Sequence, residues 1–131
     1  MNRSNRLRNP LKTARGLGSA KDGTGHWIAQ RITAVALVFL ALYVLWLVVS
    51  LAGDDYGTVR AAIARPFNAV ALVAFLIAMF WHAQLGLQVI IEDYVHAHGL
   101  AIVAQLAVRF ICALAAIASV LAVVRIALGA V

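Results

Sequence analysis

Three apolar runs cover most of this chain, at about residues 28–51, 67–91 and 100–128, and few charges interrupt them. A helix needs about 20 predominantly apolar residues to cross the hydrocarbon core of a bilayer, and each run is at least that long. The pattern therefore predicts three transmembrane helices, joined by a loop near residues 54–66 and a shorter loop near residues 92–99.

The segment before the first run, residues 1–27, is basic and rich in glycine. Gly23 and Gly25 favour irregular backbone up to His26, and Pro66 suits the first turn of the second helix. We expect one membrane-anchor domain over residues 1–131. The three crossings leave no room for a soluble catalytic domain, so we place any chemistry inside the membrane or in sites shared with partner subunits.

The composition supports this interpretation. Of the 131 residues, 64% are hydrophobic and only 12% are charged, and the mean hydropathy is +0.93. A soluble domain of this size could not bury so much apolar surface. The fold class that we predict is an all-α integral membrane protein.

Basic residues gather before or at the start of the first run, which predicts a cytoplasmic amino terminus by the positive-inside rule. They are Arg3, Arg6, Arg8, Lys12, Arg15, Lys21 and Arg31. The net charge of +6 does not indicate nucleic-acid binding, because these residues lie beside a membrane span and no aromatic residues alternate with them. The arginine-rich start also resembles an organelle transit peptide, but we favour a bacterial inner membrane over a mitochondrial one.

The second run contains an ionisable residue in its apolar interior, His82. Counted back from Ile91, it lies about 14 Å inside the helix at about 1.5 Å per residue. An imidazole at this depth is costly unless it has a function or a partner, and a neutral imidazole is a standard axial ligand of haem iron. Gly86, one turn further on, removes a side chain where a porphyrin would approach. The alternative is that His82 hydrogen-bonds a neighbouring helix, and the sequence leaves both interpretations open.

Asp93 follows His82 by eleven residues, which is three full turns plus about 20°, so both lie on nearly the same helix face. Tyr94 is adjacent. A carboxylate and a phenol at the membrane boundary can donate a hydrogen bond to a quinone carbonyl and relay a proton. The alternative is a tyrosine that anchors the helix at the interface beside an aspartate exposed to water.

The spacing of these residues resembles a known family. His82-Ala83, Gly86 and Asp93-Tyr94-Val95 match the pattern H-A-x-x-G-x-x-x-x-x-x-D-Y-V, which is similar to that of the small membrane-anchor subunit of succinate dehydrogenase. Residues 18–34, with the sequence GSAKDGTGHWIAQRITA, are similar to that family's entry into its first helix.

The resemblance implies roles for individual residues. It implies that His82 is one axial ligand of haem b, with the second ligand supplied by a partner anchor subunit. It implies that Tyr94 hydrogen-bonds a ubiquinone carbonyl and that Asp93 orients nearby basic residues or delivers protons. His26 and Arg31 would approach the haem propionates, although their spacing of five differs from the six of some relatives.

The resemblance also implies partners: a second anchor subunit (C), an iron–sulfur subunit (B) and a flavoprotein subunit (A). The chain would contribute to catalysis without being an enzyme alone. Three other functions stay open at this stage: the anchor of a fumarate reductase, a small transport subunit in which His82 and Asp93 relay protons, and a purely structural anchor. For Arg109, in the third run, we favour snorkelling toward cytoplasmic headgroups over contact with the haem.

Overall fold

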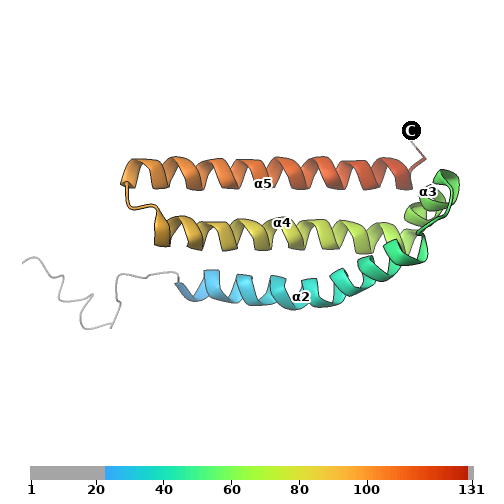
Figure 1. The fold of residues 1–131 in the computed structure, drawn as a ribbon, viewed down its shortest axis with the longest axis horizontal. Helices are drawn as coiled ribbons and strands as arrows, with labels where there is room; N and C mark the ends of the chain where they lie inside the picture. The colour runs from blue at the N-terminus through green and yellow to red at the C-terminus, as the bar shows by residue number, and fades with distance from the viewer. Residues whose placement is uncertain (1–22, 130–131) are drawn as a thin grey trace, which may run out of the picture.

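The structure, a computed structural model, describes residues 23–129. These residues form the helices α2 (Gly23–Ser50), α3 (Tyr56–Ala64), α4 (Pro66–Tyr94) and α5 (His98–Ala127) (Figure 1). Three of the helices are long and apolar enough to cross a membrane, over Thr24–Ser50, Pro66–Tyr94 and His98–Ala127. The prediction of an all-helical fold with three membrane-length helices is confirmed for residues 23–129. Arg3, Arg6, Arg8, Lys12, Arg15 and Lys21, on which the predicted orientation mainly rests, lie outside the described residues.

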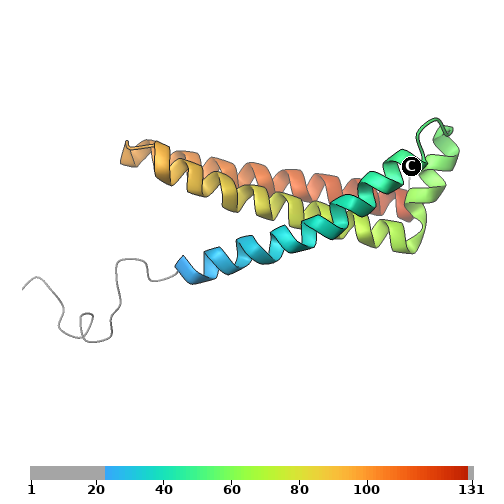
Figure 2. The same cartoon turned by 60° about the horizontal axis from the view of Figure 1, so that its bottom comes forward.

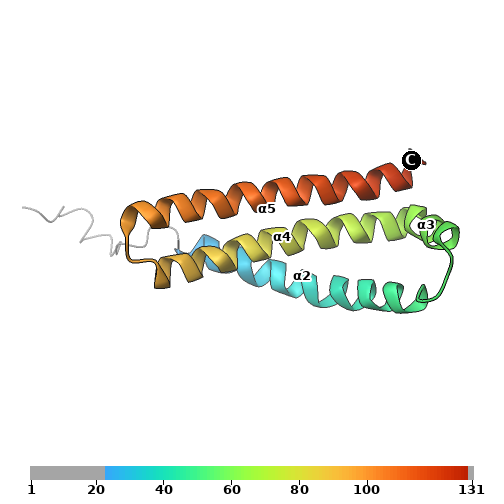
Figure 3. The same ribbon diagram turned by 45° about the horizontal axis from the view of Figure 1, so that its top comes forward.

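The three long helices form one layer with α4 in the middle (Figure 1). α4 packs against both α2 and α5, whereas α2 and α5 do not contact each other. α4 and α5 run side by side, and α2 crosses α4 obliquely (Figures 2 and 3). We call the end of the layer where α2 begins, α4 ends and α5 begins the His98 end, and the opposite end the α3 end.

The first helix begins earlier than predicted. α2 starts at Gly23, so the prediction of irregular backbone up to His26 is wrong for the residues from Gly23 onward. A glycine costs about 1 kcal/mol relative to alanine in a helix interior. That is too little to stop a helix that continues through apolar sequence for about seven more turns.

The segment predicted as a loop near residues 54–66 contains the helix α3. Asp55 caps its first turn by accepting hydrogen bonds from the Gly57 and Thr58 backbone N–H groups, and the Thr58 hydroxyl donates to the same carboxylate. These hydrogen bonds, above all that of the Thr58 side chain, lower the pKa of Asp55 below its usual value. α3 ends at Ala64 because the residue before Pro66 is held in extended backbone.

An interhelical hydrogen-bond chain fixes the α3 end of the layer. The Tyr43 hydroxyl of α2 donates to Asn68 Oδ1 at 2.7 Å, and Asn68 Nδ2 donates to the Ala62 carbonyl at 2.8 Å. Asn68 is buried, and a buried amide without partners would be costly. One side chain of α4 therefore joins α2 and α3.

The chain buries little apolar surface of its own. The buried hydrophobic residues are Leu47, Ala62, Ala71 and Leu85, and α5 contains no buried residue. Large apolar side chains on all three long helices are exposed. Such surface is far more than a soluble monomer exposes, and it fits helices covered by lipid or by other membrane subunits.

Candidate functional site

His82 lies on the side of α4 that faces α2, and it is half-buried. Its Nδ1 atom is 3.0 Å from Thr33 Oγ1 and its Nε2 atom is 3.3 Å from Gln30 Nε2. Both ring nitrogens therefore have partners on α2. The hydrogen-bonding interpretation left open by the sequence is correct as a description of the contacts within this chain.

The contacts of Thr33 assign the protonation of the imidazole. Thr33 is buried, and its hydroxyl donates toward the backbone carbonyls of Ala29 at 2.9 Å and Gln30 at 3.1 Å. A hydroxyl has one hydrogen, so when Thr33 gives it to a backbone carbonyl, Oγ1 accepts from the ring. In that arrangement the hydrogen of neutral His82 is on Nδ1, and Nε2 has a lone pair that faces the Gln30 amide. A lone pair on a neutral imidazole nitrogen is what binds a metal.

The face of α2 opposite His82 carries polar atoms without partners. His26, Gln30 and Thr33 follow one another at spacings of four and three, so they share one side of α2. His26 Nε2 and Gln30 Oε1 are buried and make no hydrogen bond. Buried polar groups are normally satisfied, so this face has capacity for further hydrogen bonds beside His82.

Packing within the chain does not require glycine at position 86. A Cβ atom placed on Gly86 would lie 3.7 Å from Gln30 Nε2, which is an ordinary van der Waals contact. The contact between α2 and α4 therefore does not depend on glycine at position 86.

Arg31 lies on another side of α2. It is exposed, and its guanidinium carbon lies 5.3 Å from the centre of the Trp27 ring, within the range of a cation–π contact. The five-residue spacing puts Arg31 about 140° around the helix from His26. The structure thus brings His26 to the side of His82 and places Arg31 away from it.

Asp93 and Tyr94 lie in the last turn of α4, at the His98 end. Both are exposed, Tyr94 to 77%. Neither side chain has a hydrogen-bond partner among residues 23–129. They are available at the His98 end for a ligand or for another subunit, about 16 Å along α4 from His82.

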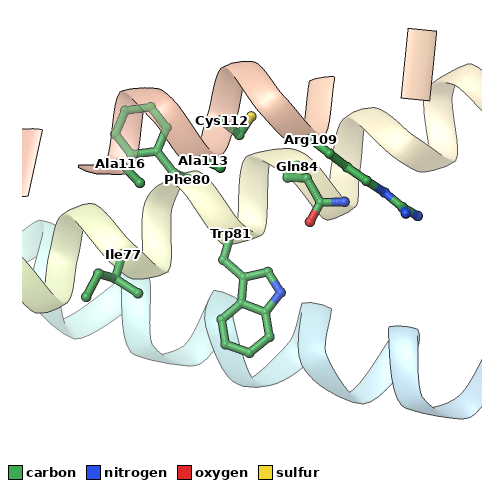
Figure 4. Close-up of a pocket in the computed structure, with 8 residues that line it drawn as sticks. All are labelled: Ile77, Phe80, Trp81, Gln84, Arg109, Cys112, Ala113 and Ala116. Atoms are coloured by element: carbon green, nitrogen blue, oxygen red, sulfur yellow. The ribbon is translucent and has the colours of Figure 1, made fainter. Parts of the chain in front are cut away.

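A second polar cluster lies between α4 and α5. Gln84 donates to Gln88 at 3.4 Å, and Gln88 donates to Glu92 at 2.9 Å. From α5, Gln105 donates to Glu92 at 3.3 Å and Arg109 donates to Gln88 at 3.4 Å. These side chains line up along both helices toward the His98 end. Arg109 extends in this direction (Figure 4), as snorkelling predicts.

The residues present fit a haem ligated partly by this chain. His82 offers a ring nitrogen whose only partner among residues 23–129 is the Gln30 side chain, and His26 has a buried, unpartnered nitrogen on the facing helix. Within the described part of the chain no three His, Cys, Asp or Glu residues cluster as a metal site.

The sequence matches, over residues 5–123, the family model described as succinate dehydrogenase/fumarate reductase transmembrane subunit. The chain belongs to this family. Within the succinate dehydrogenase/fumarate reductase transmembrane family, a succinate dehydrogenase hydrophobic membrane anchor subunit of Rickettsia bellii is 35% identical over 117 residues, which cover 89% of this chain and 94% of that protein. The resemblance identified in the sequence is confirmed.

Two further relatives carry similar names. A succinate dehydrogenase membrane anchor subunit of Reclinomonas americana is 36% identical over 94 residues, covering 70% of this chain and 78% of that protein. A hydrophobic membrane anchor subunit of Paracoccus denitrificans is 36% identical over 85 residues, covering 65% and 66% respectively. No solved structure matches the chain. Membership of the family implies association with the membrane and with the catalytic subunits of the complex.

Sequence reasoning missed Gln30 and Thr33, the two α2 residues that contact His82. Their spacing from His26 places them on one face of the first helix, and this was the available signal. It also missed the cluster of Gln84, Gln88 and Glu92, whose spacing of four could have indicated a polar stripe on the second helix.

Proposed function

We propose that this chain is the hydrophobic membrane-anchor subunit of a succinate dehydrogenase in a bacterial inner membrane, with its amino terminus in the cytoplasm. It contributes one axial ligand to a haem b and part of a ubiquinone-reducing site. It acts with a second anchor subunit, an iron–sulfur subunit and a flavoprotein subunit, and it has no catalytic activity alone. The names of its relatives and the three membrane-length helices support this proposal.

The observation that carries the haem part is the hydrogen bonding of His82. We place the hydrogen on Nδ1, facing the Thr33 hydroxyl, so that Nε2 keeps its lone pair. In metal sites a ligating histidine typically donates its other ring N–H to an oxygen, which fixes the orientation of the ring. The Thr33 hydroxyl plays that part here. When bound, the haem would take up and release one electron at a time.

Gln30 and His26 complete the α2 side of this proposed site. Within this chain the Gln30 amide lies at hydrogen-bond distance from His82 Nε2. The Gln30 side chain would have to move away before a metal could bind that nitrogen. His26, with its buried Nε2 free of a hydrogen bond, would donate to a propionate. Arg31 would reach a propionate only from outside the contact of α2 and α4, across the interface with another subunit.

Asp93 and Tyr94 supply the proposed quinone chemistry. The exposed Tyr94 phenol would donate to a quinone carbonyl and hold it in position, and Asp93 would hold or release a proton at its carboxylate. Reduction of a quinone to a quinol consumes two protons and two electrons. Residues at the His98 end, where the proposed orientation places the cytoplasm, can receive these protons from water.

A proton relay from His82 to Asp93 finds less support in the contacts. Gly86 and Val89, the residues of this face between them, carry no titratable group, and both nitrogens of His82 are engaged by α2. The anchor of a fumarate reductase would use the same site, because the family includes both enzymes.

The proposal is tested with the purified complex that contains this chain. Tyr94→Phe should lower succinate-dependent ubiquinone reduction about tenfold or more, since one hydrogen bond to the reacting quinone is removed. Succinate oxidation by a water-soluble artificial acceptor should not change. Tyr43→Phe, which removes a phenol at the α3 end, is the matched control and should reduce ubiquinone normally. Equal ubiquinone reduction by Tyr94→Phe and the wild type would favour a purely structural anchor.

A further inference from the structure

A polar cavity opens at the His98 end of the layer, beside the α4–α5 cluster. It has a volume of about 870 Å³ and is lined by Gly25, His26, Gln84, Leu85, Gln88, Glu92 and Arg109. We call this the head cavity. Its α2 side, with His26, belongs to the haem site proposed above, so its α4–α5 side is the part without an assigned ligand.

An apolar groove continues from the head cavity along the seam of α4 and α5. Its first section has a volume of about 270 Å³ and shares Gln84 and Arg109 with the head cavity (Figure 4). A second section of about 400 Å³ shares Ile77 and Ala116 with the first and extends to Val124. We call these two sections the tail groove. Apart from Gln84 and Arg109 at its beginning, the tail groove is lined by apolar residues and by Cys112.

The tail groove is long enough to hold an acyl chain that spans one leaflet of a membrane. From Arg109 to Val124 it follows about 22 Å of α5 at about 1.5 Å per residue. One leaflet contributes about 15 Å of hydrocarbon, half of a core of about 30 Å. An extended acyl chain that begins near Arg109 would therefore lie along the groove.

Charges of both signs border the α4–α5 side of the head cavity. Arg109 is exposed and donates only to the neutral Gln88, and no carboxylate within residues 23–129 lies at ion-pair distance from it. Glu92 accepts from the neutral Gln88 and Gln105. Gln88 lies between the two charged groups and contacts both. A charged arginine inside a membrane-length helix is energetically costly unless an anionic group pairs with it.

The two charges are arranged in order of depth. Glu92 lies near the end of α4, at the His98 end, whereas the backbone of Arg109 lies about 16 Å along α5 from its start by helix rise. The guanidinium reaches back to the Gln88 amide that also contacts Glu92, so the two charged groups lie close together, with Glu92 nearer the helix ends. Going inward, the order is anion, cation and apolar groove. A lipid with an ammonium group outermost, then a phosphate, then acyl chains has the complementary order.

We propose that the head cavity and the tail groove bind a phospholipid with a phosphoethanolamine headgroup, taken from the surrounding membrane. The guanidinium of Arg109 binds the phosphate through charge-assisted hydrogen bonds. Glu92 binds the ammonium, and an acyl chain lies in the tail groove beside Ile77 and Ala116. The carboxylate of Glu92 disfavours lipids whose headgroup has a net negative charge.

This site is separate from the proposed quinone position. Glu92 and Tyr94 differ by about 200° around α4, so the lipid and the quinone would occupy different sides of the helix. The bound lipid would cover part of the seam between α4 and α5. Without it, α5 has no buried residue.

The experiment is quantification of lipids that remain with the purified complex after exchange into a mild detergent, by mass spectrometry. We expect one phosphatidylethanolamine to remain with the wild type. Arg109→Gln should lower its retention about tenfold or more, because a charge-assisted hydrogen bond is lost. Arg125→Gln, at the other end of α5 and outside both cavities, is the matched control and should retain the lipid.

Two further variants separate the parts of the proposal. Ala113→Phe, which fills the tail groove without changing a charge, should also release the lipid. Glu92→Gln should reduce the preference for phosphatidylethanolamine over phosphatidylglycerol when both are offered in vesicles. Wild-type retention by Arg109→Gln or Ala113→Phe would overturn the site, and an unchanged preference in Glu92→Gln would overturn the headgroup.

The readout is independent of the proposed function. Lipid retention does not depend on ubiquinone reduction or on a haem spectrum, so a complex without haem would leave this test intact. Co-purification of this chain with the other subunits in the wild-type ratio shows that each variant complex has assembled.

Discussion

Replacing Thr33 by valine should weaken haem binding although Thr33 would not touch the haem. Valine keeps the branched shape and removes the hydroxyl that lies 3.0 Å from His82 Nδ1 and, in the proposed arrangement, accepts its hydrogen. Thr33 is 5% exposed, so water cannot readily take its place. The Nδ1–H group would be left without a partner, or the ring would move its hydrogen to Nε2 and lose the lone pair that a metal needs.

The expected size of the effect follows from these contacts. Leaving a buried donor unsatisfied costs about 1–3 kcal/mol, and removing an outer partner of a metal-binding histidine typically costs about 10–100-fold in affinity. We expect Thr33→Val to lower haem affinity within that range. Thr33→Ser keeps the hydroxyl and should stay close to the wild type.

The assay is the amplitude of the b-type absorption band per complex during incubation with a haem-binding scavenger protein. Ser50→Ala is the matched control, because it removes a hydroxyl of α2 that donates only to the Leu47 carbonyl of its own helix. Thr33→Val with wild-type haem retention would refute the proposed role of the hydroxyl. So would a loss of haem from Thr33→Ser as large as that from Thr33→Val.

Two predictions concern the α3 end. Asn68→Leu removes the amide that joins α2 to α3 and should destabilise the chain by about 1–3 kcal/mol, whereas Tyr43→Phe should destabilise it less. Thermal unfolding of the complex in detergent measures both effects. An unchanged unfolding midpoint for Asn68→Leu would contradict the packing described. Because hydrogen bonds lower the pKa of Asp55, its capping of α3 is fully present above the unfolded-state pKa and is lost as pH falls through the lowered pKa. Amide exchange of residues 56–64 should therefore speed up in acid relative to Asp55→Asn, and equal pH dependence in both would contradict the cap.

The sequence predicted the membrane fold because long apolar runs have few other stable outcomes. It missed α3 because a nine-residue helix depends on local caps. Asp55 and Pro66 provide those signals, but the surrounding glycines and charges favoured a loop. The sequence-based prediction also placed the start of α2 too late. Gly23 and Gly25 indicated irregular backbone, but the apolar sequence that follows extends the helix back to Gly23.

The site was predicted in part. His82 was found because an imidazole in an apolar helix is unusual by itself, but its partners Thr33 and Gln30 are ordinary residues in a first helix. Their importance arises from the crossing of α2 over α4, which no spacing within one helix reveals. The different surroundings of His26 and Arg31 likewise depend on which side of α2 meets α4, so only the structure separates them.

The proposal that His82 binds haem iron is tested most directly by the reduced-minus-oxidised visible spectrum of the purified complex. The spectrum is recorded for the wild type, His82→Ala and the control His98→Ala. His98 is an exposed histidine at the start of α5. We expect a b-type band in the wild type and in His98→Ala, and its loss in His82→Ala. A full band in His82→Ala, or no band in the wild type, would contradict the proposal that His82 Nε2 binds haem iron.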